Sequence, residues 1–128
     1  MTKRVLNIGQ CALDHSNISE LLNQNFSVTI DAAATHDAAI TLVTQNEYDL
    51  ILVNRLYDSD GSPGQATIEQ LCEKVSQAGD SDTDSPVMLV SNYADAQQAA
   101  QDAGAVTGFG KSQLTASSTI EILSKYLA

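Results

Sequence analysis

Short, largely apolar runs recur along the chain, separated by longer and more polar segments. Runs that are apolar without alternation are typical of strands buried on both faces of a parallel sheet. The pattern therefore predicts five strands, the last of them the weakest, at residues 5–8, 28–30, 50–53, 87–90 and 105–106.

The segments between these runs carry apolar residues at helical spacing. An apolar residue at every third or fourth position forms one stripe that can face a core. This spacing predicts five helices, marked by Ile18, Leu21, Leu22 and Phe26, by Ala39, Leu42 and Val43, by Ile68, Leu71, Cys72 and Val75, by Ala96, Ala99, Ala100 and Ala103, and by Ile120, Leu123 and Leu127.

Polar residues and a glycine predict where some of these helices begin and end. Asp14 or Ser16 is the expected N-cap of the first helix, and Thr35 or Asp37 that of the second. Gly104 is expected to end the fourth helix. A polar segment at residues 77–86 predicts a loop before the fourth strand.

The alternation of strands and helices defines a fold class. Five strands, each followed by a helix, form an α/β (βα)5 unit, and short right-handed connections place helices on both faces of the sheet. The length of 128 residues suits one domain. We therefore expect a doubly wound, three-layer sandwich with a five-stranded parallel sheet, forming a single domain over residues 1–128.

Composition and charge exclude several classes of function. Six Lys and Arg against sixteen Asp and Glu give a net charge of −10, which repels nucleic acid. No apolar run is long enough for a membrane helix. Cys11 and Cys72 lack the spacing of a zinc site or a disulfide framework. We expect a cytoplasmic protein that binds neither nucleic acid nor a membrane and contains no metal.

The candidate functional residues follow the predicted strands. In a doubly wound sheet, ligands bind beyond the carboxyl ends of the strands. Residues at those positions are Gly9, Gln10 and Cys11 after the first strand, Asn54 after the third, Ser91 after the fourth and Lys111 after the fifth.

These positions and their neighbours resemble the receiver domain of bacterial response regulators, the CheY-like family, over nearly the whole chain. The resemblance is carried by the segments at residues 49–54, 58–61, 86–91 and 103–111. It implies a flavodoxin-like sheet with strand order 2-1-3-4-5 and a role in two-component phosphorelay signalling.

The resemblance also shows which functional residues of the family are replaced. The family's acidic pair, which holds Mg²⁺, corresponds to Gly9 and Gln10, and its phosphoacceptor Asp corresponds to Asn54. The Ser/Thr and Lys that contact the phosphoryl group are retained as Ser91 and Lys111. An amide is a very poor nucleophile, and Mg²⁺ favours charged oxygen ligands. We expect neither phosphorylation at Asn54 nor Mg²⁺ at the family's site, and hence no cofactor.

A second set of expectations concerns the surroundings of this site. The family's aromatic residue before the Lys corresponds to Gly108. Lys111 is expected to hydrogen-bond Asn54 and backbone carbonyls. Asp58 and Asp60 are a weaker hypothesis for substitute phosphoacceptors. The low-charge face of the fourth helix, expected to point outward, suits protein contact through Gln97, Gln98 and Gln101.

Two functional hypotheses follow. The first is a stand-alone, atypical receiver that is not an enzyme and acts through protein–protein interaction, with a histidine kinase or another response regulator as partner and a homodimer as a further option. The alternative is a flavodoxin-like domain that binds a small molecule or an anion in the cleft near Asn54, Ser91 and Lys111. Neither His15 nor His36 has the companions of a catalytic base, and both are expected at the surface.

Overall fold

The computed structural model describes residues 2–78 and 85–128, with the backbone alone at residues 73–78. Strands and helices alternate as predicted. The strands are β1 (Lys3–Ile8), β2 (Val28–Ala33), β3 (Leu50–Asn54), β4 (Val87–Val90) and β5 (Val106–Phe109). The helices are α1 (Ala12–Asn25), α2 (His36–Gln45), α3 (Gly64–Ala78), α4 (Ala94–Asp102) and α5 (Ser117–Leu127), with a short 3-10 helix η2 (Lys111–Gln113) before α5.

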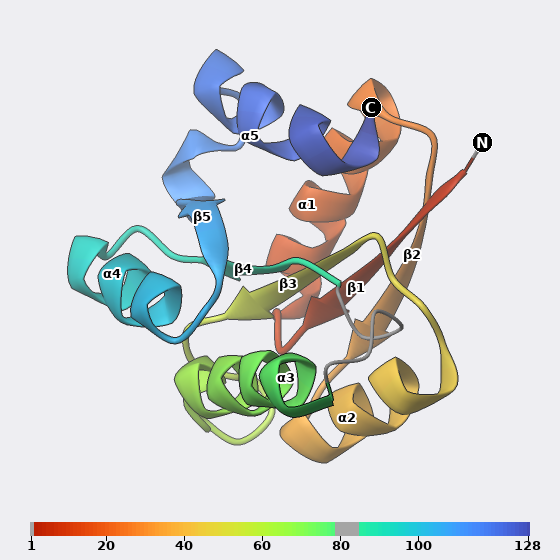
Figure 1. Ribbon diagram of the computed structural model, residues 1–128. Helices are drawn as coiled ribbons and strands as arrows, with labels where there is room; N and C mark the ends of the chain where they lie inside the picture. The colour runs from red at the N-terminus through yellow and green to blue at the C-terminus, as the bar shows by residue number, and fades with distance from the viewer. Residues whose placement is uncertain (1, 79–84) are drawn as a thin grey trace.

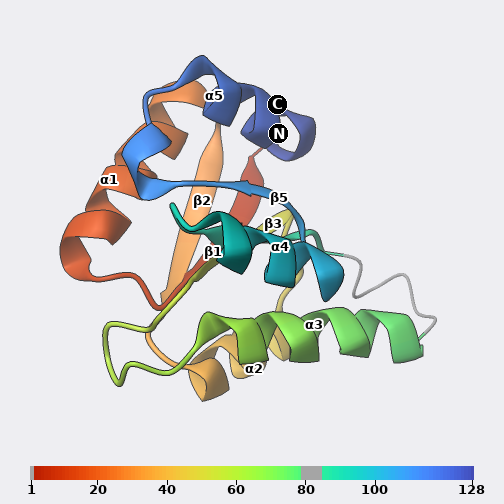
Figure 2. The same ribbon diagram turned by 90° about the vertical axis from the view of Figure 1, so that its left-hand side faces the viewer.

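The strands form one parallel sheet in the order β2-β1-β3-β4-β5. Helices α1 and α5 cover one face of the sheet, and α2, α3 and α4 cover the other (Figures 1 and 2). This arrangement confirms the predicted doubly wound, three-layer sandwich and its strand order of 2-1-3-4-5.

The buried side chains form two clusters, one on each face of the sheet. Alternate residues of a strand point to opposite faces, so Leu52 packs on the α1–α5 side and Ile51 on the α2–α4 side. All five residues of β3 are buried. Burial on both faces explains why this strand is apolar up to Asn54.

Helix ends differ in part from the prediction. The N-cap of α1 is Cys11, whose sulfur accepts a hydrogen bond from the Asp14 backbone N–H, so the expected caps Asp14 and Ser16 were wrong. Thr35 caps α2 as predicted, accepting from the backbone N–H of Ala38. Gly104 follows α4 with a φ of 118°, a conformation that favours glycine.

The stripes on α3 and α4 also differ in detail. Ile68 and Leu71 are buried and Cys72 is half-buried, as expected, whereas the side chain of Val75 and residues 79–84 of the expected loop lie outside the described residues. On α4, Ala100 is buried but Ala99 is exposed. Among the described residues, no helix is long and apolar enough to cross a membrane.

Candidate functional site

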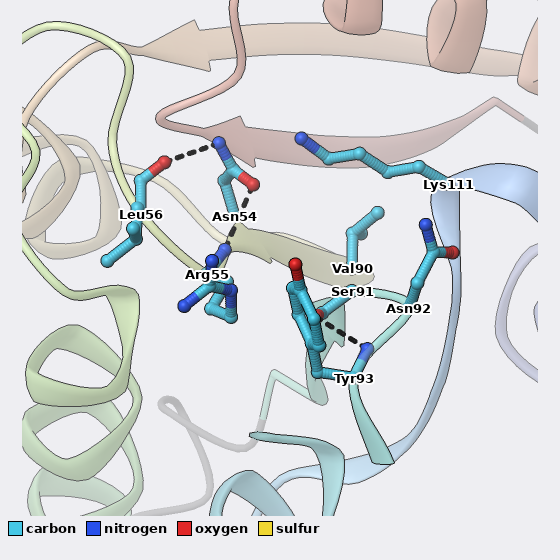
Figure 3. A pocket seen from close by; sticks show the side chains of 8 residues that line it. All are labelled: Asn54, Arg55, Leu56, Val90, Ser91, Asn92, Tyr93 and Lys111. Atoms are coloured by element: carbon cyan, nitrogen blue, oxygen red, sulfur yellow. Dashed lines mark hydrogen bonds between the residues drawn. The ribbon is translucent and has the colours of Figure 1, made fainter. Parts of the chain in front are cut away.

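The carboxyl edge of the sheet brings most of the predicted site residues together. Asn54 ends β3, Ser91 follows β4 and Lys111 begins η2 after β5. All three line a hollow of about 190 Å³ together with Arg55, Leu56, Val90, Asn92 and Tyr93 (Figure 3). Gly9 and Gln10 follow β1 at the same edge but do not line this hollow.

Asn54 is 6% exposed and uses both ends of its carboxamide. Its Nδ2 donates to the carbonyl oxygens of Gly9 (2.9 Å) and Leu56 (2.6 Å), and its Oδ1 accepts from the backbone N–H of Arg55 (2.9 Å). Both amide protons are therefore engaged. The side chain joins the end of β1 to the loop after β3.

Gly9 lies beneath the ring of Tyr57. Its φ is 76°, and a Cβ built there would lie 2.0 Å from Cδ1 of that ring. The Gly9 carbonyl also accepts from the backbone N–H of Asp58 (3.0 Å), in addition to Asn54. Tyr57, which is 1% exposed, therefore occupies the space that any side chain at position 9 would need.

The residues present do not fit the Mg²⁺ that the resemblance implies. Gly9 offers no side-chain ligand, Gln10 offers a neutral amide, and the Asn54 oxygen already accepts from Arg55. The carboxamide atoms of Gln10 are buried and have no hydrogen-bond partner among the described residues. Nor do the described residues contain a group of three or more His, Cys, Asp or Glu placed to hold a metal ion.

Lys111 is paired with Asp14 rather than with Asn54. Its Nζ lies 2.7 Å from Asp14 Oδ2, and both side chains are about one-third exposed, at 31% and 28%. The hydrogen bond from the Lys111 ammonium lowers the pKa of Asp14 despite partial burial. The expected Lys111–Asn54 contact is wrong, because an acidic residue in the first turn of α1 lies within reach of the ammonium.

Ser91 is 6% exposed and orients the loop that follows β4. Its Oγ accepts from the backbone N–H of Tyr93 (3.1 Å), and its own N–H donates to the Phe109 carbonyl (3.0 Å). The first of these bonds is drawn in Figure 3. The Ser91 hydroxyl thus acts as a turn-forming group.

Gln97 points toward the sheet, contrary to the expected outward face of α4. Its Nε2 donates to the carbonyls of Leu89 (2.9 Å) and Ser91 (3.1 Å), with a longer bond to Phe109 (3.4 Å). Pairing of β4 and β5 is irregular at this point. A Cβ on Gly108 would lie 2.1 Å from the Leu89 oxygen and 2.8 Å from Gln97 Oε1, so this position has no room for a side chain.

The remaining candidates stand apart from the hollow. Asp58 and Asp60 are exposed in the turn after β3, where the Asp60 carboxylate accepts from the backbone N–H of Ser62; this bond lowers the pKa of Asp60. Both histidines are half-buried. His15 contacts Asn7 and His36 contacts Thr67.

Sequence reasoning missed Arg55 and Tyr57, which shape this edge, and gave Asp14 and Gln97 other roles, an N-cap and an outward-facing contact. Their roles depend on which strand ends and helix turns meet in space. One signal was present in the sequence, because Gly9 leaves a gap that a large neighbouring side chain can fill. Nothing in the sequence pairs Gln97 with β4 and β5.

Comparisons with known proteins agree with this fold. Neither a protein-family model nor a curated protein matches the sequence. Among solved structures, NtrX from Brucella abortus matches with a TM-score of 0.76 and 14% identity over 99% of this chain, which spans 27% of NtrX. A response regulator from Thermotoga maritima matches with a TM-score of 0.75 and 19% identity, covering 98% of each chain.

A third neighbour was solved with ligands. It is a response regulator protein from Burkholderia pseudomallei with a phosphorylated aspartic acid, a calcium ion and citrate (TM-score 0.68, 17% identity). The match covers 96% of this chain and 72% of the Burkholderia protein. At these identities the likeness establishes the fold. The chain has the CheY-like, flavodoxin-like fold that these response regulator structures share.

Proposed function

We propose that residues 1–128 act as one receiver-like domain of two-component signalling that is not phosphorylated at Asn54 and acts by binding another protein. The fold shared with response regulators supports the signalling class. The absence of phosphorylation is supported by the hydrogen bonds of the Asn54 carboxamide, because both its nitrogen and its oxygen bond to the surrounding backbone.

The chemistry of Asn54 argues against phosphoryl transfer. A receiver's aspartate attacks phosphorus through a charged oxygen, whereas an amide is neutral and its nitrogen lone pair is delocalised. Here the oxygen is also held by the Arg55 N–H and the nitrogen by two carbonyls. With no acidic pair at Gly9 and Gln10, the residues that would bring a metal ion to the phosphoryl group are missing as well.

The proposed partner is a histidine kinase or another response regulator. Both are protein classes of two-component signalling, and the structural neighbours include response regulators. A second copy of the chain is a weaker proposal, since two molecules that each carry a net charge of −10 repel one another.

Phosphorylation is tested by intact-mass measurement after incubation with acetyl phosphate and Mg²⁺. The account predicts no phosphoryl adduct, while a response regulator with its phosphoacceptor Asp, treated in parallel, gains one. An adduct on this protein, mapped to any residue of the edge including Asp58 or Asp60, would contradict the proposal.

Partner binding is tested with the purified histidine kinases and response regulators of the same genome, by calorimetry with and without the phosphodonor. We expect at least one of them to bind. Treating this protein with the phosphodonor before mixing should leave the affinity unchanged. If none binds, or if binding requires phosphorylation of this protein, the proposed function fails.

The alternative function is binding of a small molecule or anion in the hollow. The hollow near Asn54, Ser91 and Lys111 favours it. However, Asn54 and Lys111 already bond to other residues of the chain. A saturable rise in Tm with inorganic phosphate or small carboxylates would support this alternative, because a ligand that binds only the folded state stabilises it. We expect no such rise.

A further inference from the structure

The hollow beside Asn54 differs in charge from the rest of the molecule. The chain carries sixteen acidic and six basic residues. Yet the eight residues that line the hollow include two cations, Arg55 and Lys111, and no acid. Lys111 is paired with Asp14. Arg55 forms no ion pair among the described residues, and its guanidinium carbon lies 4.5 Å from the centroid of the Tyr93 ring.

Exposed apolar side chains flank the same hollow. Among the described residues, the large apolar side chains that are exposed are Leu13 (69%), Tyr93 (57%) and Leu56 (44%). Two of these three line the hollow, and Figure 3 shows Arg55 drawn between Leu56 and Tyr93. Exposed apolar groups beside an arginine and an aromatic ring are typical of protein contact sites.

Hydrogen bonds from Asn54 and Ser91 hold the backbone of these residues in place. Asn54 bonds to the backbone of both Arg55 and Leu56, and Ser91 accepts from the backbone N–H of Tyr93. Leu56 also forms an isolated antiparallel bridge with Pro63. Fixing the backbone in this way reduces the entropy lost on binding.

We propose that Arg55, Leu56 and Tyr93, here called the loop surface, dock a partner-protein segment in which a single carboxylate stands beside apolar side chains. A carboxylate of that segment pairs with Arg55, and a neighbouring apolar side chain packs between Leu56 and the Tyr93 ring. The inference rests on the proposed function, because it names the surface through which that function acts.

Charge complementarity selects this occupant. A locally basic site on a chain of net charge −10 attracts a single negative group, while the surrounding field repels a nucleic-acid backbone. The same net charge opposes a second copy. The apolar flanks have no role in binding a free anion, whereas they provide contact area for a peptide.

The test uses amide NMR of the labelled protein with two matched probes, the pentapeptides acetyl-Ala-Leu-Asp-Leu-Ala-amide and acetyl-Ala-Leu-Asn-Leu-Ala-amide. We expect the aspartate peptide to shift the amides of the loop surface and Ser91. The asparagine peptide should bind roughly fivefold more weakly, as expected when a partly exposed charge pair is lost. Equal binding of the two peptides, or no clustered shifts, would overturn the proposal.

Variants assign the contact to the loop surface. Arg55→Gln should weaken the aspartate peptide about fivefold, and Tyr93→Ala should weaken it while Tyr93→Phe does not. Lys3→Gln is the charge-matched control, because Lys3 lies at the start of β1, at the end of the strands opposite the hollow. It should leave binding unchanged. A matching urea midpoint for each variant shows that it is folded. If Lys3→Gln weakens binding as much as Arg55→Gln, the attraction is general and the proposal fails.

Two further outcomes point to other occupants and would also overturn the proposal. Sodium acetate giving the same shifts at the same concentration would define a small-anion pocket. Self-association of the wild-type protein that Arg55→Gln abolishes would define a contact between copies. In a last outcome, the peptide fails to bind while the protein stays unphosphorylated by intact mass and still binds a kinase or a regulator. That result would refute the docking surface alone and leave the proposed function standing.

Discussion

The two halves of the carboxyl edge use their polar groups in different ways. In the β1–β3 half, Gly9 and Asn54 are bonded to each other and to the loop after β3, and Tyr57 fills the remaining space. In the β4–β5 half, Ser91 and Lys111 line an open hollow, which is bordered by the exposed ring of Tyr93 and by Arg55 from the loop after β3; Arg55 forms no ion pair among the described residues.

This difference separates chemistry from recognition. In the closed half the polar atoms bond to one another and stabilise the fold; its residues Gly9 and Asn54 are among those that we propose replace the metal ligands and phosphoacceptor of receivers. The open half retains an accessible cation and apolar surface, which suit contact with another protein. The predictions that follow are attempts to disturb one half at a time.

The largest effect is expected at Gly9. Gly9→Ala should lower the free energy of unfolding by about 3 kcal/mol, because the methyl group meets the Tyr57 ring and the left-handed φ is costly. Gly61→Ala is the matched control, since Gly61 has a φ of 73° and nothing within 4 Å of a built Cβ; it should cost about 1 kcal/mol. Urea denaturation measures both, and equal costs would show that the β1–β3 half is not closed by Tyr57.

The next effect tests the Asn54 carboxamide. Asn54→Asp should cost about 2 kcal/mol at pH 7, because the oxygen that replaces Nδ2 faces the carbonyls of Gly9 and Leu56 without a donor, while the other oxygen keeps the Arg55 N–H. Asn23→Asp, which alters one exposed hydrogen bond to Ser19, should change stability by less than about 0.5 kcal/mol.

The pH dependence of the Asn54→Asp variant gives a second readout. We expect repulsion from the two carbonyls to disfavour the charged form of the introduced carboxyl in the folded protein. The variant should therefore regain stability as the pH falls and the introduced carboxyl is protonated, since its O–H can donate to one of the two carbonyls. A cost that stays constant between pH 4 and 7 would contradict this account of Asn54.

A smaller effect is expected at the β4–β5 irregularity. Gln97→Ala removes the donor shared by the carbonyls of Leu89 and Ser91 and should cost about 1.5 kcal/mol. Gln98→Ala, one position along α4, loses an exposed bond to Asp102 and should cost no more than about 0.5 kcal/mol. Similar costs for the two substitutions would mean that Gln97 does not support the open half.

The smallest effect concerns the Lys111–Asp14 pair. The pKa of Asp14 is lowered in the folded state, so its contribution to stability is present above the unfolded pKa and is lost as pH falls through the folded pKa. Lys111→Met should cost about 0.5 kcal/mol near neutral pH and less in acid. Lys125→Met, at an exposed position on α5, should show no such pH dependence in urea midpoints measured from pH 3 to 7.

The sequence predicted the fold well because its apolar runs carry the information directly. The runs at β3 and β4 are continuous since both faces of those strands are buried, and the resemblance to receivers supplied the strand order that the structure confirms. The three residues Asn54, Ser91 and Lys111 were placed together correctly because parallel strands end at one edge.

The contacts made by these residues were harder to predict. Lys111 reaches Asp14 across 97 positions of sequence, and a lysine can bond any acceptor within its radius. Gln97 was assigned to the outer face of α4 because the alanine stripe was expected to face the core, yet the irregular β4–β5 pairing leaves carbonyls that its amide satisfies. Such pairings depend on local backbone geometry, which residue type and spacing do not encode.

The most direct measurement of the central claim is an amide NMR titration with Mg²⁺, followed by Mg²⁺ with beryllofluoride as a mimic of the phosphoryl group. The account predicts no specific shifts at Gly9, Asn54, Ser91 or Lys111, because the β1–β3 half is occupied by its own hydrogen bonds. Saturable shifts clustered at those four residues would show that the edge still accepts a metal ion and a phosphoryl group, and would contradict the account.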